Sequence, residues 1–595
     1  MKKLFILSLS CIFTSTLFAF FNIVFRADIS ILAFPLCIVF VSVLFYFAIF
    51  CLFKKNDAKK IAVARKLYQY LPFILLIAFV FRRAGNYGTS HLFDFITVFL
   101  WLITSVLSII IQHSLSEKQL KKKFSEWYSV VQLQNEKKLS PFMKIVKEIF
   151  EWIDAFIQAA FTVALLNIFI IQLYVIPSES MVPEFLEQDR VVVFKTASGP
   201  KFPLSDVGIP QLRSYDRGDI IVFRNPHYGK DRKSEVQSFV SQLVYTLTFT
   251  LVNLNVDENG QLKADPLVKR ITGLPGEQLM MQDGILYSRT KNSLEFQPVT
   301  DDALWAEWNL SSLPKKLLDK VRDIPVSEKV YDDMIKCEQM RRELDLDDVR
   351  NTVLDLSNRF SILKEKIYGK ETTVSAVPSV LAQDNLNAYL LFAGSDEFTR
   401  NLLLTDGGSL WFEAFMCEWI GCIPENAFED KTFLIGGDLY SDACFKLNLL
   451  IKQTFGELVV LNTEFISKGI PMSQWRQNNQ WTELMSKAQI LYEYIILQDS
   501  RNMPVFPANT AEGEPQFIPE NNYFMMGDNR FNSLDMRHSY DRITTKLTSF
   551  DPYSIVYDSN MSPQYVSAKD ILGTTVLRFW PWDRKGIPGL TGKNN

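Results

Sequence analysis

The sequence predicts a membrane protein in which N-terminal transmembrane helices precede a mainly antiparallel β domain outside the membrane, and this domain carries a large helical insertion. Three observations predict this fold class. Apolar residues dominate positions 1–175 of the 595-residue chain. Short strand-like segments follow them, and a long stretch with helical periodicity interrupts those segments. A chain of this length is expected to form a membrane part and more than one soluble unit.

Five segments have the apolar length of membrane-spanning helices. They are approximately residues 4–25, 29–53, 67–81, 91–112 and 153–174. The third segment is short, and Pro72 lies near its start. A cleaved signal peptide is the alternative interpretation of the first segment, but that apolar run is long and lacks a clear small-x-small cleavage site.

The charges between these segments predict the orientation of the chain. Lysines and arginines crowd the gap at 54–66 and the segment 118–147. The positive-inside rule then places the N-terminus in the cytoplasm and everything after residue 175 outside. Arg82 and Arg83 fall on the outer side, against the rule. We expect a multi-pass protein of the inner (cytoplasmic) membrane with an extracytoplasmic soluble part.

Composition limits the classes of function. The net charge of −3 argues against a basic nucleic-acid surface. Among the seven cysteines, Cys417 and Cys422 lack zinc spacing and a nearby histidine. One or two disulfides between soluble cysteines stay open if that region is extracytoplasmic. Only four histidines are present, which restricts both metal sites and Ser-His-Asp chemistry.

The soluble part divides into a discontinuous β domain, residues 176–290 and 517–595, around a helix-rich insertion at 291–516. Asp283-Gly284 predicts a tight turn. The candidate strands are residues 189–196, 218–224, 266–273, 284–289, 522–527 and 571–580.

Two stretches interrupt the strands. Residues 239–254 are apolar but contain polar side chains, so a surface helix, a core strand and a helix with one face in the outer leaflet all remain open. Within the insertion, apolar residues from Leu346 to Ile367 recur at steps of three and four and stop at Gly369. This pattern predicts an amphipathic helix that packs within its own domain.

Ser180 lies between Pro177 and Pro183, just beyond the last apolar segment. A reactive serine needs a base, and the histidines are poor candidates because of their positions. Lys269 is flanked by apolar residues on a predicted strand, where burial can lower the pKa of a lysine toward 7–8, a shift worth roughly 4 kcal/mol. Lys269 and Arg270 are neighbours on this strand and face opposite sides, so one can be buried while the other is solvated.

Four ordered blocks resemble the bacterial type I signal peptidases (leader peptidases). They are residues 176–183 (IPSESMVP), 216–223 (DRGDIIVF), 267–277 (LVKRITGLPGE) and 527–537 (GDNRFNSLDMR), and residues 577–581 (LRFWP) also match. The blocks cover about a third of the chain. Glu184-Phe185, Met536 and His538 depart from the family pattern.

The resemblance implies a role for each matched residue. Ser180 is the expected nucleophile and Lys269 the general base that also protonates the leaving amine. The backbone N–H of Ser180 and the hydroxyl of Ser178 would form the oxyanion hole. Ser533 would hydrogen-bond the Lys269 amine, and Asp535 and Arg537 would form a supporting ion pair. No metal or cofactor is required.

The implied function is that of a membrane-bound serine endopeptidase that removes N-terminal signal peptides from exported preproteins after small residues at the −3 and −1 positions. The expected partners are preprotein signal peptides, the lipid bilayer and a secretion machinery, but no nucleic acid. Two alternatives remain open: a catalytically silent membrane scaffold that binds exported chains, and a processing protease for a narrow substrate set with the insertion as adaptor.

Overall fold

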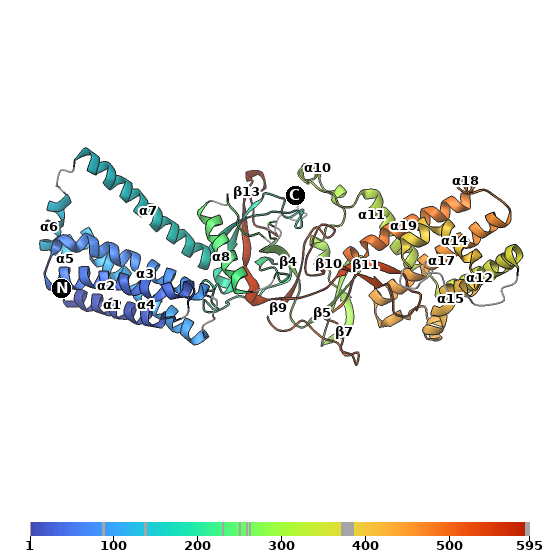
Figure 1. Ribbon diagram of the computed structural model, residues 1–595, viewed down its shortest axis with the longest axis horizontal. Helices are drawn as coiled ribbons and strands as arrows, with labels where there is room; N and C mark the ends of the chain where they lie inside the picture. The colour runs from blue at the N-terminus through green and yellow to red at the C-terminus, as the bar shows by residue number, and fades with distance from the viewer. Residues whose placement is uncertain are drawn as a thin grey trace.

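Figure 1 shows the computed structural model, an elongated molecule with apolar helices at one end, β-sheets in the middle and a helical region at the other end. The structure describes residues 2–25, 27–85, 90–135, 140–228, 231–248, 251–256, 260, 263–369 and 386–589. The N-terminal apolar helices and the mainly antiparallel sheet of the predicted fold class are confirmed.

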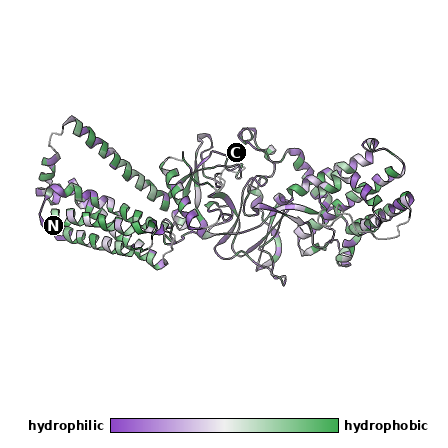
Figure 2. Ribbon diagram, in the orientation of Figure 1, coloured by the Kyte–Doolittle hydropathy of each residue, from purple (hydrophilic) through white to green (hydrophobic). Residues whose placement is uncertain are grey.

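Within the described residues, five helices are long and apolar enough to cross a membrane, as the hydropathy colouring in Figure 2 shows at the N-terminal end. They are Lys2–Phe21 (α1), Ile29–Lys54 (with α2 at Ala33–Leu44), Ala58–Ala84 (with α3 at Ile61–Ala84), His91–Ser114 (α4) and Pro141–Phe169 (α7). Two short helices, α5 (Glu117–Lys123) and α6 (Ser125–Asn135), lie between α4 and α7.

Two predicted spans need correction. The third helix is longer than predicted and contains Pro72, so the proline does not end it. The fifth helix ends at Phe169, and Ile171–Val175 instead forms strand β1, which pairs with β2. Gln172 and Tyr174 of β1 are buried, whereas the apolar Ile171 and Leu173 are exposed and continue the hydrophobic run of the helix into the strand.

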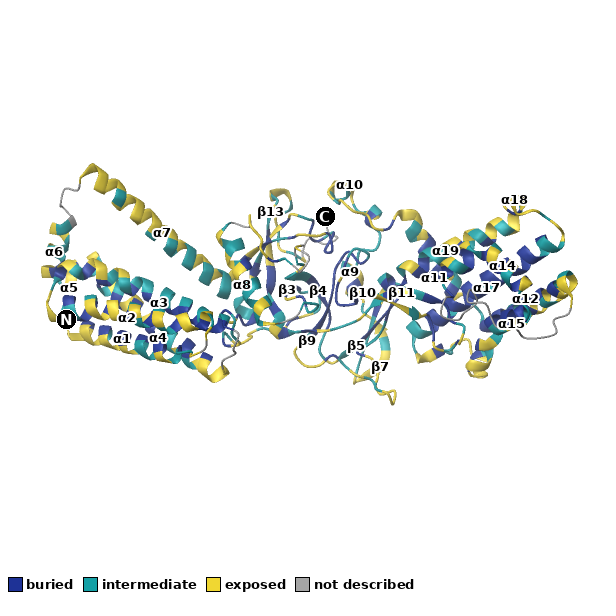
Figure 3. Ribbon diagram, in the orientation of Figure 1, coloured by how far each residue is buried: buried dark blue, intermediate teal, exposed yellow. Residues whose placement is uncertain are grey.

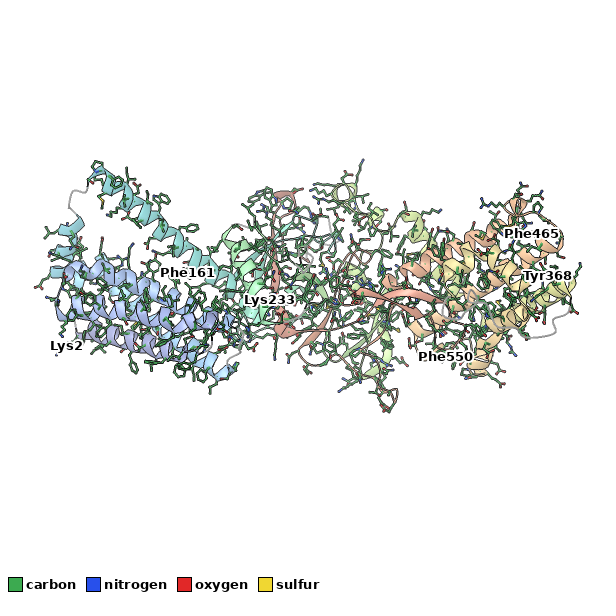
Figure 4. The ribbon with its side chains drawn as sticks, viewed as in Figure 1. Lys2, Phe161, Lys233, Tyr368, Phe465 and Phe550 are labelled. Atoms are coloured by element: carbon green, nitrogen blue, oxygen red, sulfur yellow. The ribbon has the colours of Figure 1, made fainter. Side chains whose placement is uncertain are left out.

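Helices α1 to α4 share a buried core, whereas α7 stands apart (Figure 3). No residue of α7 is buried within the protein. Its contacts with α3 include the stacked rings of Phe73 and Phe161, 4.4 Å apart, and an ion pair of 3.3 Å between Lys66 and Asp154. Figure 4 labels Phe161 on this helix. An apolar helix with no buried residue suits contact with lipid.

The central region holds a seven-stranded sheet in the order β1-β2-β13-β3-β4-β9-β12, in which all pairs are antiparallel. A four-stranded sheet, β7-β6-β5-β8, and a two-stranded ribbon, β10-β11, complete it. The strands are β1 (Ile171–Val175), β2 (Arg190–Phe194), β3 (Ile220–Phe223), β4 (Leu267–Gly273), β5 (Glu277–Gln282), β6 (Ile285–Thr290), β7 (Ser293–Pro298), β8 (Met503–Phe506), β9 (Asn522–Met526), β10 (His538–Lys546), β11 (Val556–Met561), β12 (Val566–Ser567) and β13 (Ile571–Trp580). All six strand candidates correspond to strands, and Asp283-Gly284 forms the turn between β5 and β6, with both residues at positive φ.

The helical region lies between β7 and β8 in the chain. Its helices are α9 (Asp302–Trp305), α10 (Lys315–Leu318), α11 (Glu328–Arg342), α12 (Leu346–Tyr368), α13 (Ala388–Ala393), α14 (Ser395–Leu404), α15 (Gly408–Cys417), α16 (Asn426–Glu429), α17 (Leu439–Ser467), α18 (Met472–Trp475) and α19 (Asn479–Arg501). The predicted amphipathic helix is α12, which buries Val353 and Phe360 and ends at Gly369 with φ at 83°. The range 291–516, which we expect to be helical, also contains β7 and β8, and both strands pair in the four-stranded sheet.

The β10–β11 ribbon reaches into the helical region. The loop between its strands places Phe550 among the helices, as labelled in Figure 4, and buries Asp551 beside Lys452 and Asn448 of α17. The Asn448 amide group donates to Asp551 over 2.8 Å, and its carbonyl oxygen accepts from the Ile555 amide over 2.8 Å. The ribbon therefore couples the last part of the β domain to the insertion.

Two segments join the β domain to the membrane helices. The first segment is the stretch at 239–254, which falls partly in helix α8 (Arg232–Leu247). Its described residues form no strand, so the alternative of a core strand is wrong there. Thr246 of α8 accepts a hydrogen bond from Asn167 of α7 over 3.2 Å. The loop after β2 inserts Phe202 between Phe169 and Trp101, at ring distances of 4.9 and 5.4 Å.

Arg82 and Arg83, whose predicted outer position disagrees with the positive-inside rule, lie at this junction. The Arg82 guanidinium donates to Asp94 over 2.7 Å, and Arg83 donates to the Leu204 carbonyl over 2.5 Å. Ser205 also donates to Asp94 over 2.7 Å. The two cations are thus buried and neutralised in part by an acid, so they do not act as free positive charge in a loop.

Candidate active site

The loop that carries Ser180 is fixed at both ends. Directly after β1, the Ile176 amide donates to the Asp189 carbonyl over 2.8 Å, and Gln188 returns a bond of 2.9 Å to the Ile176 carbonyl. Between these points Met181 and Phe185 are buried in the protein interior. The loop is therefore a closed turn anchored by apolar side chains, and it presents Ser180 toward the sheet.

Lys269 lies on β4, in the middle of the seven-stranded sheet. In the register of the sheet it pairs with Ile221 of β3, and its neighbour Arg270 pairs with Met526 of β9. The Lys269 Nζ is 2.5 Å from the Ser180 Oγ. The side chains of Ser180 and Lys269, which lie 89 positions apart in the chain, are thus in direct hydrogen-bond contact.

Both members of this pair are shielded from water. Ser180 is 8% exposed and Lys269 is 3% exposed. Burial lowers the pKa of Lys269 to about 8, although the charges of Asp535 and Asp528 oppose this fall and Arg537 adds to it. A lysine with such a pKa is neutral for a substantial part of the time near neutral pH and can accept a proton.

Two hydrogen-bond donors lie beside the Ser180 hydroxyl. The Ser178 hydroxyl donates to the Ser180 Oγ over 3.4 Å. Among the residues that the structure describes, the backbone amide of Ser180 donates to no acceptor. Both groups are consequently available to an oxygen atom that carries negative charge beside Ser180.

Asp535 and Arg537 form the expected ion pair, which is fully buried. The Arg537 Nε lies 2.9 Å from an Asp535 oxygen, and the Gly527 amide donates to the other oxygen over 2.9 Å. Burial opposes ionisation of the carboxyl group, but the Arg537 charge prevails and lowers the pKa of Asp535 well below its usual range. Arg537 also donates to the Ser500 carbonyl over 2.7 Å, which ties this block to the end of α19.

Ser533 differs from its expected role. Its side-chain oxygen is buried, but among the described residues it has no hydrogen-bond partner, so it does not bind the Lys269 amine in this structure. It lies close to Gly527, where a Cβ atom would overlap both the Ser533 hydroxyl and the Ser180 carbonyl oxygen. Gly527 therefore allows the serine loop and the last block to approach each other.

Arg270 is buried on the opposite face of the strand, as Lys269 is on its own face. Arg270 is 2% exposed, and its guanidinium binds both oxygens of Asp528 at 2.8 and 2.6 Å. It also lies 4.9 Å from the Trp305 ring centre. Alternation along a strand puts Arg270 on the opposite face to Lys269, but the segment after β7 covers that face, so neither side is open.

Two residues of the site were not singled out from the sequence. Asn529 donates from its amide side chain to the Glu179 carbonyl over 3.0 Å and from its backbone to the Ser180 carbonyl over 3.2 Å. Glu179 is 6% exposed despite its charge. The only signal in the sequence was the position of each residue inside a matched block, since an Asn or a Glu in a loop is ordinarily solvated.

The departures from the family pattern are accommodated by packing. Phe185 and Met536 are both fully buried. His538 begins β10, and its ring bonds the Asp499 carbonyl over 3.2 Å, away from Ser180.

In the described part of the chain, no group of three or more His, Cys, Asp or Glu residues could hold a metal ion.

Comparison with known proteins identifies the class. The family described as "Signal peptidase, peptidase S26" matches residues 149–308 and 467–580. A signal peptidase I of Buchnera aphidicola subsp. Baizongia pistaciae is 31% identical over 145 residues, which are 24% of this chain and 41% of that relative. A signal peptidase I of Pseudomonas aeruginosa is 25% identical over 203 residues, 30% of this chain and 70% of that relative. The chain therefore spans less than half of the first of these relatives.

The matched ranges cover most strands of the antiparallel sheet. The first matched range contains both Ser180 and Lys269, and the second contains the block at 527–537. The two matched ranges and these relatives support the bacterial type I signal peptidase family for this part of the chain. The family match includes α7 but neither the preceding membrane helices nor the greater part of the helical region.

Proposed function

We propose that this protein is a membrane-bound serine endopeptidase that cleaves N-terminal signal peptides from exported preproteins, with Ser180 as nucleophile and Lys269 as general base. The contact of 2.5 Å between Nζ and Oγ, both buried, carries the proposal. A lysine in this position replaces the histidine of a conventional triad. We place the catalytic domain outside the inner membrane, next to the outer end of α7.

The reaction proceeds through an acyl-enzyme. Neutral Lys269 accepts the hydroxyl proton of Ser180 while Oγ attacks the scissile carbonyl carbon. The amide of Ser180 and the hydroxyl of Ser178 stabilise the resulting oxyanion. As the C–N bond breaks, the Lys269 ammonium gives its proton to the leaving amine. A water molecule, deprotonated by Lys269, then releases the signal peptide from the ester.

The supporting groups keep the base neutral and in place. Asp535 and Asp528 are the acids that act on Lys269, yet each already binds an arginine, Arg537 and Arg270 respectively. Their charges are therefore partly cancelled at the amine. The buried ion pair of Asp535 with Arg537 also supports the loop that holds Gly527 and Ser533 against the nucleophile.

Cleavage of a preprotein by the detergent-solubilised protein tests this function. The wild-type chain should release the signal peptide, and Ser180→Ala should abolish the release, because no other hydroxyl replaces Oγ. Ser562→Ala, at an exposed serine of the same domain, is the matched control and should cleave at the wild-type rate. Full activity of Ser180→Ala would reject Ser180 as the nucleophile, and an inactive wild type would favour the scaffold alternative.

A further inference from the structure

A segment at the start of the helical region lies directly on the nucleophile loop. We name residues 309–323 the strap; it contains α10 and lies beyond the first range matched by the family. Just before the strap, the Glu307 amide donates to the Asp528 carbonyl over 2.7 Å, and the Glu307 carbonyl accepts from the Arg530 amide over 3.1 Å. The strap therefore starts from the block that packs on Ser180.

Apolar side chains then hold the strap against the loop. Val182 and Leu186, which follow the nucleophile, are buried together with Leu310. Further leucines and a valine of the strap pack on the same cluster: Leu313, Leu317 and Val321. Val182 is fully buried although it lies only two residues after Ser180. The strap consequently covers one side of the catalytic loop.

The far end of the strap binds the residue between Ser178 and Ser180. One Glu179 carboxylate oxygen accepts from the Arg322 amide over 2.6 Å, and the other accepts from the Asp323 amide over 3.0 Å. The main-chain carbonyl of the same Glu179 accepts from Asn529 and from the Val182 amide. Glu179 thus joins the strap, the loop and the last block.

We propose that Glu179 is a positioning residue, and that by binding the strap it holds the backbone between Ser178 and Ser180 in the orientation that catalysis requires. This inference rests on the proposed function. The reasoning is geometric: the oxyanion donors are the groups on either side of Glu179, and a rotation of that one residue redirects both. A displacement of about 1 Å in a catalytic group can cost ~10²-fold in rate.

Glu179→Gln tests the contact because it keeps the shape of the side chain. The substitution replaces one of the two acceptor oxygens with an NH₂ group. This group faces a backbone N–H, so two donors repel each other and one of the two hydrogen bonds to the strap is lost. We expect kcat for preprotein cleavage to fall roughly 10–100-fold, while KM and the pH at half-maximal rate stay as in the wild type. The matched control is Glu187→Gln, because Glu187 also binds Arg322, through an exposed guanidinium at 2.8 Å, and should stay within about twofold.

A second variant separates positioning from folding. Leu317→Ala loosens the strap without touching Glu179 and should lower kcat in the same direction by a smaller factor. Because both changes act through one element, the double variant should be no slower than Glu179→Gln alone. Multiplied effects in the double variant, or a rate loss in Glu179→Gln that equals its loss of folded protein, would overturn the proposal.

Hydrogen exchange provides a readout that does not depend on activity. The Arg322 and Asp323 amides, and those of residues 178–182, should exchange at least tenfold faster in Glu179→Gln than in the wild type or in Glu187→Gln. Unchanged exchange at both segments would reject the contact even if cleavage is slow. If the wild type itself fails to cleave a preprotein, the proposed function fails, and the exchange result alone then decides whether Glu179 holds the strap.

Discussion

Two buried lysines, one in the β-sheet and one in the helical region, show what distinguishes a base from a structural cation. Lys269 of β4 is 3% exposed and Lys452 of α17 is 0% exposed. Burial lowers the pKa of each to about 8, and an aspartate opposes the fall in both cases. The difference lies in the direct partner, which is a serine hydroxyl for Lys269 and the Asp551 carboxylate for Lys452.

The comparison teaches that a lowered lysine pKa alone does not identify a catalytic site. The Lys452 ammonium is held by a buried carboxylate, whose pairing would be lost on deprotonation. Lys269 is influenced by the charges of Asp535 and Asp528, but each of these aspartates binds an arginine. The direct partner of Lys269 is therefore the Ser180 hydroxyl. A proton can move between Lys269 and Ser180 without breaking an ion pair.

The largest expected effect comes from removing each lysine in turn. Lys269→Ala should reduce the cleavage rate per folded molecule by at least ~10³-fold, because no group remains to take the Ser180 proton. Lys452→Ala should leave that rate unchanged. Preprotein cleavage, normalised to the folded fraction, measures both variants. If Lys269→Ala and Lys452→Ala lose the same fraction of the cleavage rate, the burial that the two lysines share determines activity, and the hydrogen-bonding partner of each lysine does not.

The second effect is on stability and reverses the order of the lysines. Lys452→Ala leaves the Asp551 charge buried and unpaired, which should cost about 3–5 kcal/mol of unfolding free energy. Adding Asp551→Asn should recover much of this loss, since the unpaired charge disappears. Denaturant unfolding followed by tryptophan fluorescence gives the comparison. If Lys452→Ala alone is as stable as the wild type, the ion pair of Lys452 with Asp551 contributes little to the stability of the helical region.

The third effect concerns the cost of keeping Lys269 buried. Its folded pKa of about 8 lies below its ordinary value of 10.5, so the unfolded chain binds the proton more tightly. Stability is therefore reduced below pH 8 and rises as the pH increases from 8 to 10.5. Lys269→Met should stabilise the protein at pH 7 by up to about 3 kcal/mol and by little near pH 10. Unfolding temperatures in detergent at both pH values test this, and destabilisation at both would contradict it.

The smallest effect is the pH profile of the wild type. With the neutral amine of Lys269 as the proposed base, the rate should fall about tenfold for each pH unit below 8 and level off above it. Steady-state cleavage between pH 6 and 9.5 measures the midpoint. Lys452→Ala should keep the same midpoint. A flat profile over this range would exclude a lysine with this pKa as the base.

Much of the sheet could be predicted because its central strands are rich in β-branched residues and bounded by turns. β5 was not predicted, since its Leu279, Met280 and Met281 carry no strand preference. β10 is largely exposed and polar, so its sequence resembles a loop. β1 was assigned to the fifth membrane helix because hydropathy does not reveal where a continuous apolar run changes from helix to strand.

The contact between Ser180 and Lys269 could be predicted, but a local rule alone is not enough to select Lys269. Lys269 was chosen as a lysine among apolar residues, and Lys452, in the run Leu449-Leu450-Ile451-Lys452, satisfies the same rule. The strand context and the matched blocks separated them. Contacts that depend on tertiary packing could not be predicted, such as Glu179 with the Arg322 amide, because a backbone donor leaves no mark in the sequence.

The insertion of Phe202 into the membrane helices has a mechanical consequence. A body joined to a membrane by a single helix can swivel about that joint in every direction. Phe202 contacts Trp101 and Phe79 of the helical bundle as well as Phe169 at the end of α7, so the β domain is held at a second place. This second attachment lies beside the end of α7 and restricts how the β domain can turn about that helix. The height of Ser180 above the bilayer then becomes a property of the folded chain, set in advance of any encounter with a substrate.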